Sequence, residues 1–386
     1  MDIPFIYYKP VTGKNFIGRT PDIHVLGNLL RQGENIVIYE PPKSGKNSLV
    51  QQTFFNMRIG KMQFDLAEFS LLNSRTIADV MMGIGSSILK NKGNSPADYA
   101  QDVEQYLPGT HFVFDPQAYN SNQRILSLNW DIDDNDITSI LTLPYRLAKD
   151  SGQKMYVVLN EFQNIMYTED GEHVCKLFEN VLKELPAEDK MMASYLFLGS
   201  KVNAMKEIFE HKKYFYKQVE RVKLSEIDSK EIIDFAVRCF LAEGKVLDRG
   251  LMLGVCKLFR NNAWYINHFC SICDSFSKGY IMEPILLESL DALIAINEPN
   301  FNAIMNDLTT FQVCLLRAIL DGHRRFSSAE VIRRYNLNSS ANVRRLKDAL
   351  CKKEIITFEG GEDDVVILDP LFEYWVAKYF FKIKAE

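Results

Sequence analysis

One short segment of the chain combines residues that could hold a phosphate. It lies between a short apolar run, residues 35–39, and a helical pattern that starts at residue 48. Its residues are Glu40, Pro41, Pro42, Lys43, Ser44, Gly45, Lys46, Asn47 and Ser48. In a phosphate-binding loop, N–H groups at a helix N-terminus surround the phosphate oxygens and a lysine contacts the outer phosphates. Gly45 and Lys46 match these roles, and the order of strand, loop and helix favours such a loop over a chance match.

Two positions of this loop depart from the usual pattern. Glu40 stands where the first glycine is expected, and its carboxylate could repel phosphate or point to solvent. Asn47 stands where a Ser or Thr hydroxyl normally holds magnesium, and it offers a weaker carbonyl ligand. The loop therefore predicts nucleotide binding with impaired magnesium affinity.

A second apolar run, residues 155–159, ends in a pair of polar residues that belong beside this loop. The carboxyl ends of parallel strands form the ligand edge of an open α/β sheet. The pair is Asn160-Glu161, where Asp-Glu would supply a magnesium ligand and a residue that positions the attacking water. Glu161 is thus the candidate catalytic base, and Asn47 and Asn160 are weak magnesium candidates. Binding of ATP or ADP is predicted, magnesium is doubtful, and hydrolysis remains open.

The surrounding elements predict an α/β domain over residues 1–228. Strands expected at 62–69, 155–159 and 194–198 alternate with helices at 76–89 and 138–149, as in a doubly wound parallel sheet. The polar residues 91–136 are interpreted as an insertion. A helical subdomain follows over 229–304.

Residues 305–386 have a different pattern. Helical stretches at 311–321, 328–335 and 339–353 precede β runs at 355–358 and 365–368, which Gly360 and Gly361 separate. Three helices followed by a hairpin predict a winged helix-turn-helix.

Bulk composition excludes several classes of protein. The chain of 386 residues is 47% hydrophobic with a net charge of −5, which is ordinary for a globular protein of two or three domains. No apolar run is long enough to span a membrane, and the start carries an acid where a signal peptide needs basic residues. Seven scattered cysteines indicate no disulfide framework. We therefore expect a cytoplasmic protein without a membrane partner.

With these motifs in view, the chain resembles the archaeal-type branch of the AAA+ ATPases, relatives of origin-recognition and STAND ATPases. The resemblance rests on the two strand ends above, on residues 198–200, on residues 262–266 and on the segment Phe16, Ile17, Gly18, Arg19. It implies that this last segment lines the adenine and that Ser200 senses the γ-phosphate. The family's arginine after residue 214 is missing, because Gln218 takes its place, with Lys217 beside it as a substitute cation.

The carboxy-terminal module carries a local excess of basic residues. Between residues 308 and 354 the chain has ten basic residues against four acids. The residues suited to base edges and phosphates are Asn342, Arg344, Arg345 and Lys347. Duplex DNA is the expected partner. The alternative is that the module packs on its own ATPase or on a protein, and the acidic wing residues Glu362, Asp363 and Asp364 argue against a wing on phosphate.

Three functions are consistent with these patterns. The first is an ATP-binding AAA+-type switch, with slow turnover if any, coupled to a DNA-binding winged helix. The second is a non-catalytic pseudo-ATPase that serves as a protein-interaction scaffold, with a protein partner or self-association. The third is a pure DNA-binding regulator. The sequence identifies neither the DNA site, the partner, the pathway nor the oligomeric state.

Overall fold

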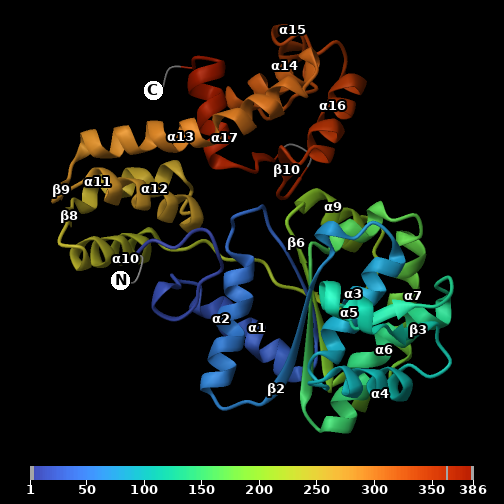
Figure 1. Cartoon of the computed structure of the whole chain (residues 1–386). Coiled ribbons are helices and arrows are strands. Elements are labelled where there is room, and N and C mark those ends of the chain that lie inside the picture. The colour runs from blue at the N-terminus through green and yellow to red at the C-terminus, as the bar shows by residue number, and fades with distance from the viewer. Residues whose placement is uncertain (1–3, 362–363, 384–386) are drawn as a thin grey trace. The chain divides into compact units, whose positions relative to one another are not determined.

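The computed structural model in Figure 1 describes residues 4–361 and 364–383. The chain forms two compact units. We call residues 20–40 and 49–224 the sheet unit, and residues 1–19, 41–48 and 225–386 the helical unit. The phosphate-binding loop thus belongs to the helical unit, although it connects two elements of the sheet unit.

The sheet unit is built on five parallel strands in the order β2-β5-β6-β1-β7. Their bounds are β1 Asn35–Tyr39, β2 Phe64–Ser70, β5 Lys154–Asn160, β6 Ala193–Gly199 and β7 Val219–Arg221. All seven residues of β6 are buried, as are the apolar residues of β1 and β5. Continuous apolar runs form such strands because helices cover both faces of a parallel sheet. The register pairs Asn160 with Ser70 and Leu198, so the polar strand ends meet at one edge.

Helices flank this sheet on both faces, with α1 and α2 on one side and α3, α6 and α7 on the other (Figure 1). Their bounds are α1 Thr20–Gln32, α2 Lys46–Ile59, α3 Ile77–Leu89, α6 Asp134–Ser151, α7 Gly171–Glu184, α8 Ala187–Lys190 and α9 Val202–Lys206. Short 3₁₀ or π turns occupy Gly13–Asn15, Leu71–Asn73, Phe162–Tyr167 and Glu207–His211. The predicted parallel α/β sheet is confirmed.

The segment interpreted as a polar insertion contains regular elements that its composition did not suggest. They are α4 Pro96–Tyr106, β3 Phe112–Phe114, α5 Pro116–Asn122 and β4 Leu126–Leu128. Much of its polarity is used at helix starts, where Ser95 with Asp98 and Asp133 with Asp136 form capping boxes. Several of its apolar residues, such as Val103 and Leu126, are buried, whereas Trp130 is exposed.

The helical unit contains the remaining helices and two small sheets. The bounds are α10 Ser229–Ala242, β8 Val246–Leu247, α11 Arg249–Leu258, α12 Ala263–Phe276, β9 Tyr280–Ile281, α13 Glu283–Asn306, α14 Thr310–Leu320, α15 Ala329–Arg334, α16 Ser340–Lys352, β10 Ile356–Phe358, β11 Val365–Ile367, α17 Pro370–Trp375 and a π turn at Val376–Phe380. The predicted winged helix is present as α14 to α16 with the β10-β11 hairpin. We did not predict α17.

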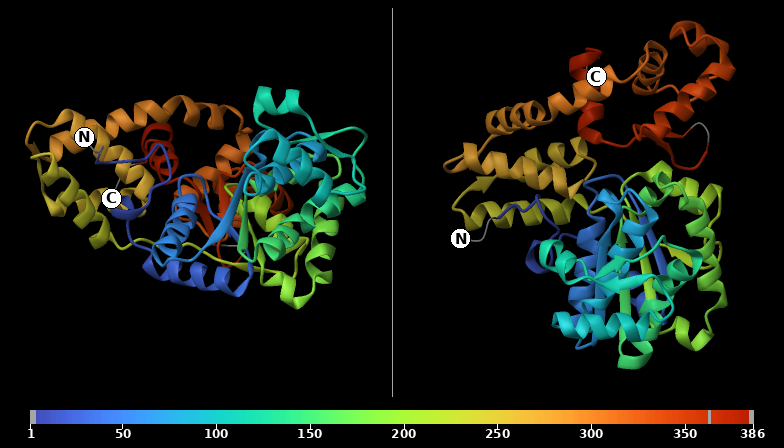
Figure 2. Two further views of the ribbon diagram at one scale, coloured as in Figure 1. Left: turned by 60° about the horizontal axis from the view of Figure 1, so that its bottom comes forward. Right: turned by 45° about the vertical axis from the view of Figure 1, so that its right-hand side comes forward.

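A single apolar core joins the lid helices α10 to α13 to the winged helix. The ring of Phe301 on α13 packs on Phe372 and Trp375 of α17, with centroids 5.6 and 5.5 Å away. Figure 2 shows α13, in orange, extending from the yellow lid helices to the red winged helix. The lid and the winged helix therefore pack as one body within this unit.

Candidate functional site

The loop that was predicted to bind phosphate connects β1 to α2. Lys43 and Gly45 have φ of 67° and 91°, and the Ser44 N–H bonds to the Pro41 carbonyl at 3.3 Å. Lys46 opens α2 and is 7% exposed, while the neighbouring Asn47 is exposed. The hydroxyl of Ser44 is buried and has no hydrogen-bond partner among the described residues. A buried donor without a partner beside a buried lysine is a suitable site for an oxyanion ligand.

Arg19 holds the loop from the preceding segment. Its Nη1 donates to the Ser44 carbonyl and its Nε to the Ser225 carbonyl, both at 2.8 Å. Gly18 precedes it with φ of 64°, and a Cβ there would lie 2.8 Å from Ile227. The segment 16–19 thus joins the loop to the first residues after the sheet unit.

These segments enclose a cavity of about 280 Å³ within the helical unit. Predicted site residues on its wall are Phe16, Ile17, Arg19, Lys43, Ser44, Gly45, Lys46, Asn47 and Ser48. Gly18, Pro41 and Pro42 do not line the cavity. The structure adds lining residues that we did not predict, chiefly Tyr7, Tyr8, Trp264 and Asn267. The aromatic character of residues 5–8 was a usable signal for the first two.

Lys43 connects the loop to the lid and the winged helix. Its ammonium lies 4.1 Å from the ring centre of Trp264 and donates to the Tyr265 hydroxyl at 3.4 Å. That hydroxyl donates to both carboxylate oxygens of Asp369, at 2.8 and 2.7 Å. Asp369 in turn caps α17 by accepting from the N–H groups of its first turn. Burial lowers the pKa of Lys43, and the nearby Asp369 carboxylate opposes that shift.

In the sheet unit, the structure brings Glu161 together with Ser200. The Ser200 hydroxyl donates to Glu161 Oε2 at 2.5 Å, and Gln163 Nε2 donates to the same oxygen at 2.7 Å. Glu161 has a left-handed backbone, with φ of 56°, where β5 ends. Such conformations cost energy in non-glycine residues and are concentrated at functional sites. Asn160 lies one residue earlier, as the last residue of β5.

Three charged residues near the strand ends of the sheet unit have contacts of their own. The Glu40 carboxylate accepts a hydrogen bond from the Leu224 N–H at 3.2 Å, so this acid is tied to the backbone. Arg221 lies over the Tyr39 ring at 4.1 Å and pairs with Glu210. Lys217 lies over its neighbour Tyr216 at 5.4 Å.

The predicted DNA-contact residues on the winged helix fall into two groups. Arg344 and Arg345 on α16 are exposed. In contrast, the Asn342 amide donates to the Leu337 carbonyl at 3.0 Å, and the Lys347 ammonium lies 4.8 Å from the Phe358 ring centre. Asp364 pairs with Arg324 at 2.8 Å, whereas Glu362 and Asp363 lie outside the described residues. Arg344 and Arg345 are therefore better placed than Asn342 and Lys347 to bind a polyanion such as DNA.

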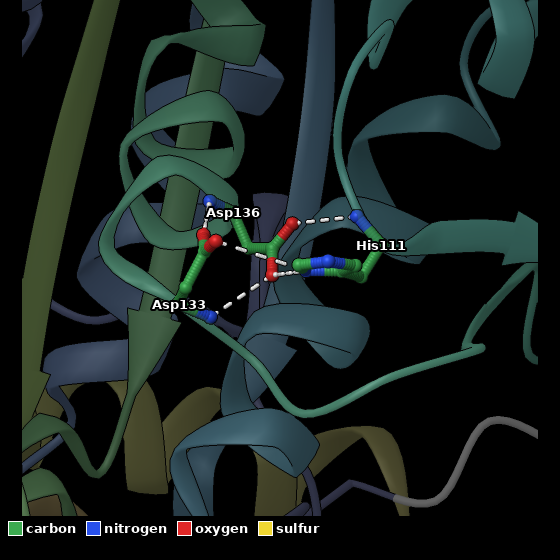
Figure 3. Close-up of side chains that lie close together, drawn as sticks. All are labelled: His111, Asp133 and Asp136. Atoms are coloured by element: carbon green, nitrogen blue, oxygen red, sulfur yellow. Dashed lines mark hydrogen bonds and ion pairs between the residues drawn. The ribbon is translucent and has the colours of Figure 1, made fainter.

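Figure 3 shows a cluster in the sheet unit with the residue types of a metal site. The Asp136 side chain is 0% exposed and accepts from the His111 N–H at 2.7 Å and from the Asp133 N–H at 2.9 Å. His111 Nδ1 lies 2.9 Å from the same carboxylate. Both Asp136 oxygens are therefore already used to fasten the insertion to the start of α6. We interpret the cluster as a structural clip.

Comparisons with known proteins agree with this architecture. A family model described as a probable winged helix domain matches residues 299–378. A Walker-type ATPase of Pyrococcus abyssi superposes with a TM-score of 0.66 at 15% identity, over 96% of this chain and 98% of that one. The ORC2 protein of Aeropyrum pernix, in its ADPNP-ADP complexes, superposes with a TM-score of 0.58 at 15% identity, over 93% of each chain. Its ADP form gives 0.54 at 13%, over 97% of this chain and 98% of that one.

These similarities establish the fold. The chain has the architecture of AAA+-type P-loop ATPases, with a parallel α/β sheet and a carboxy-terminal winged helix. No curated protein matches the sequence. Among the described residues, no helix has both the length and the apolar character needed to cross a bilayer.

Proposed function

We propose that this chain is an ATP- and ADP-binding switch whose nucleotide state sets the position of a DNA-binding winged helix. One observation carries the proposal. Lys43 belongs to the wall of the phosphate-loop cavity and also to the chain of contacts that ends at Asp369 on the winged helix. Because Lys43 belongs to the loop itself, an incoming phosphate would attract its ammonium away from Tyr265.

The residues around the cavity fit a nucleotide. Lys46 and the N-terminus of α2 supply positive charge for phosphates, and the unpartnered Ser44 hydroxyl supplies a further donor. Phe16, Ile17 and Tyr7 supply the apolar wall that a base requires. The ORC2 structure that contains ADPNP and ADP has the same fold, which supports this assignment.

Magnesium fits this site less well. Asn47 and Asn160, at the two metal positions, offer neutral amide oxygens, and magnesium prefers anionic oxygens in octahedral geometry. If hydrolysis occurs, Glu161 would act as the base that orients water and Ser200 would hold its carboxylate. We therefore propose slow turnover at most.

The alternative is a pseudo-ATPase that acts as an interaction scaffold, with a protein partner or a second copy. The amides at residues 47 and 160 favour it. Magnesium-dependent hydrolysis that disappears in both Lys46→Ala and Glu161→Gln would eliminate this alternative.

The coupling is tested with Tyr265→Phe, which removes the hydroxyl between Lys43 and Asp369 and keeps the ring. Fluorescence anisotropy of labelled duplex DNA would be recorded with and without ADP and ATP. We expect nucleotide to change the DNA affinity of the unaltered protein and to change that of Tyr265→Phe much less. Tyr280→Phe is the matched control, because Tyr280 is 73% exposed in the same unit. Equal nucleotide effects in all three proteins would refute the coupling.

A further inference from the structure

The insertion at residues 91–136 of the sheet unit has a strong excess of acidic residues. Its eight acids are Asp98, Asp102, Glu104, Asp115, Asp131, Asp133, Asp134 and Asp136, and its two bases are Lys92 and Arg124. The exposed acids are Glu104, Asp131, Asp133 and Asp134. Two of them pair with histidines, and in the part of the chain that the structure describes no lysine or arginine pairs with any of the four. This surface is therefore negative at neutral pH.

An apolar pocket of about 380 Å³ lies between α4 and β3, beside one of these acids. Its wall contains Val103 and Leu107 from the α4 side and Phe112 from β3. Val103 and Leu107 are four residues apart, so they lie on one face of the helix. Glu104 is the charged residue of the wall. Such a pocket suits an apolar side chain that has basic neighbours.

A highly exposed tryptophan follows β4, the strand that pairs with β3. Trp130 is 72% exposed, and a second depression of about 400 Å³ is lined by residues 128–131. The two hollows meet across the hairpin, because Phe112 of the first is opposite Leu128 of the second. Tryptophan is enriched among the residues that contribute most to binding at protein interfaces. An exposed tryptophan beside an apolar pocket therefore indicates a binding surface.

From these observations we propose that this acidic face of the insertion binds a basic segment of another protein. The acidic face consists of the α4–β3 pocket with Glu104, Trp130, Asp131 and Asp134. A leucine-sized side chain of the segment enters the pocket, and flanking lysine or arginine side chains pair with the acids. A further cation lies on the exposed ring of Trp130. The inference is independent of the proposed nucleotide and DNA binding, because the whole face belongs to the insertion.

The basic winged helix of a second copy fits this face less well. Its arginines would satisfy the acids, but the pocket also requires an exposed apolar side chain beside them. Among residues 308–354, all of which the structure describes, Phe311 is the only large apolar side chain that is exposed. The nearest basic residue in the sequence is Arg317, six positions away. We therefore assign the basic segment to a different protein.

The first test keeps the full chain unaltered and changes the ligand. The probe is a fluorescent lysine peptide with leucine at every third position, and fluorescence anisotropy measures its affinity. Replacing lysine by glutamate removes the charge complementarity, and replacing leucine by alanine removes the apolar anchor. Each replacement should weaken binding by about tenfold or more, and added salt should weaken binding of the original peptide. The proposal is overturned if the original peptide does not bind, or if either replacement leaves its affinity unchanged.

The second test changes the protein. Trp130→Ala should weaken binding of the lysine–leucine peptide by about tenfold, as the loss of an aromatic anchor does. Glu104→Gln with Asp131→Asn should also weaken it and should reduce its dependence on salt. The matched controls are Ile59→Ala, at a position that is 65% exposed, and Glu184→Gln, at an exposed acid. Both lie in the sheet unit outside the insertion and should keep the original affinity.

Two outcomes of this second test would overturn the proposal. Unchanged affinity in either variant of the acidic face would show that the peptide binds elsewhere on the protein. Sedimentation of the protein without peptide gives the other outcome. Self-association that Trp130→Ala abolishes would assign the acidic face to a second copy of this chain.

Discussion

The Ser200 hydroxyl donates to Glu161 Oε2 across 2.5 Å, and so joins the ends of two neighbouring strands, β5 and β6. Gln163 donates to the same oxygen. Two donors on one carboxylate oxygen fix the orientation of a residue that already has a left-handed backbone. Glu161 is therefore held at the carboxyl edge of the parallel sheet, the edge at which open α/β sheets bind ligands.

The first prediction concerns turnover. In Glu161→Gln the side chain keeps its shape but loses its basicity, so any magnesium-dependent hydrolysis should fall by about 100-fold or more. Nucleotide affinity should stay nearly constant. Phosphate release and calorimetry measure the two quantities, and Glu169→Gln, at an exposed acid eight residues later, is the control. A Glu161→Gln protein that hydrolyses ATP at the original rate would exclude Glu161 as the base.

The second prediction concerns the metal. Asn47→Thr with Asn160→Asp introduces a hydroxyl and a carboxylate at the two positions where the sequence predicts magnesium ligands, and both groups are good magnesium ligands. Adding magnesium should then tighten ATP binding by about tenfold, or about 1.4 kcal/mol, compared with little change in the unaltered protein. Calorimetry with magnesium and with a chelator measures this difference. Strong magnesium dependence before any substitution would contradict the expectation.

The third prediction concerns the winged helix and salt. If Arg344 and Arg345 contact phosphates, Arg344→Ala should weaken duplex DNA binding and lower the slope of log affinity against log salt by about 1. Arg345→Ala should do the same. Lys176→Ala removes an exposed charge of the same sign from the sheet unit and should change neither quantity. Unchanged slopes in both arginine variants would favour the scaffold alternative.

The fourth prediction concerns pH and the clip in Figure 3. The hydrogen bond to Asp136 raises the pKa of His111 from its ordinary 6.5. Burial by itself would raise the pKa of the Asp136 carboxyl. Hydrogen bonds from the His111 and Asp133 N–H groups outweigh burial and hold this pKa below 3.8. The His111 contribution is therefore complete below pH 6.5 and is lost as pH rises through the raised pKa. The Asp136 contribution is complete above pH 3.8 and is lost as pH falls through the lowered pKa.

Substituting His111→Asn removes the titrating group and keeps a side-chain donor. Hydrogen exchange in the segment 107–136 should be faster in this variant than in the unaltered protein near pH 6, and similar in the two near pH 9. Because the two proteins are compared at equal pH, the intrinsic exchange rates cancel. A difference that grows with pH would contradict the assigned sign.

The fifth prediction concerns the turn into Ser200. A Cβ on Gly199 would lie 2.3 Å from Met205 Cγ, and Met205 is 0% exposed. Gly199→Ala should therefore lower the free energy of unfolding by about 1–3 kcal/mol, as overpacking does. Gly254→Ala, in α11 with open space around the site, should stabilise by about 1 kcal/mol instead. Urea denaturation measures both, and equal effects would contradict the packing argument.

Local patterns predicted the parts of the fold that depend on neighbouring residues. The apolar runs gave β1, β5 and β6 to within one or two residues, because such strands are buried on both faces. The helices predicted at 76–89 and 339–353 are present as α3 and α16, and the structure shows that Thr76 and Ser339 cap them.

The remaining features depend on contacts between distant segments, which periodicity does not reveal. Tyr7 and Asn267 lie 260 positions apart, yet both line one cavity. Asn342 was predicted to contact DNA because of its residue type, whereas in the structure its amide donates a hydrogen bond to the Leu337 carbonyl. The insertion was interpreted as polar from its composition, although its Asp136 side chain is fully buried and is held by three hydrogen bonds.

The long helix α13 connects the lid helices to the winged helix, so a small rotation at one of its ends becomes a larger displacement at the other. Its 24 residues span about 36 Å at 1.5 Å per residue. One end follows β9 among the other lid helices, and the other end is fastened to α17 through Phe301 and through a 3.3 Å hydrogen bond from Trp375 to Glu298. A tilt of about 5° at the lid end would carry the far end through about 3 Å, given this length. If nucleotide binds as we propose, a small tilt at the start of α13 would therefore become a displacement of about 3 Å at the winged helix.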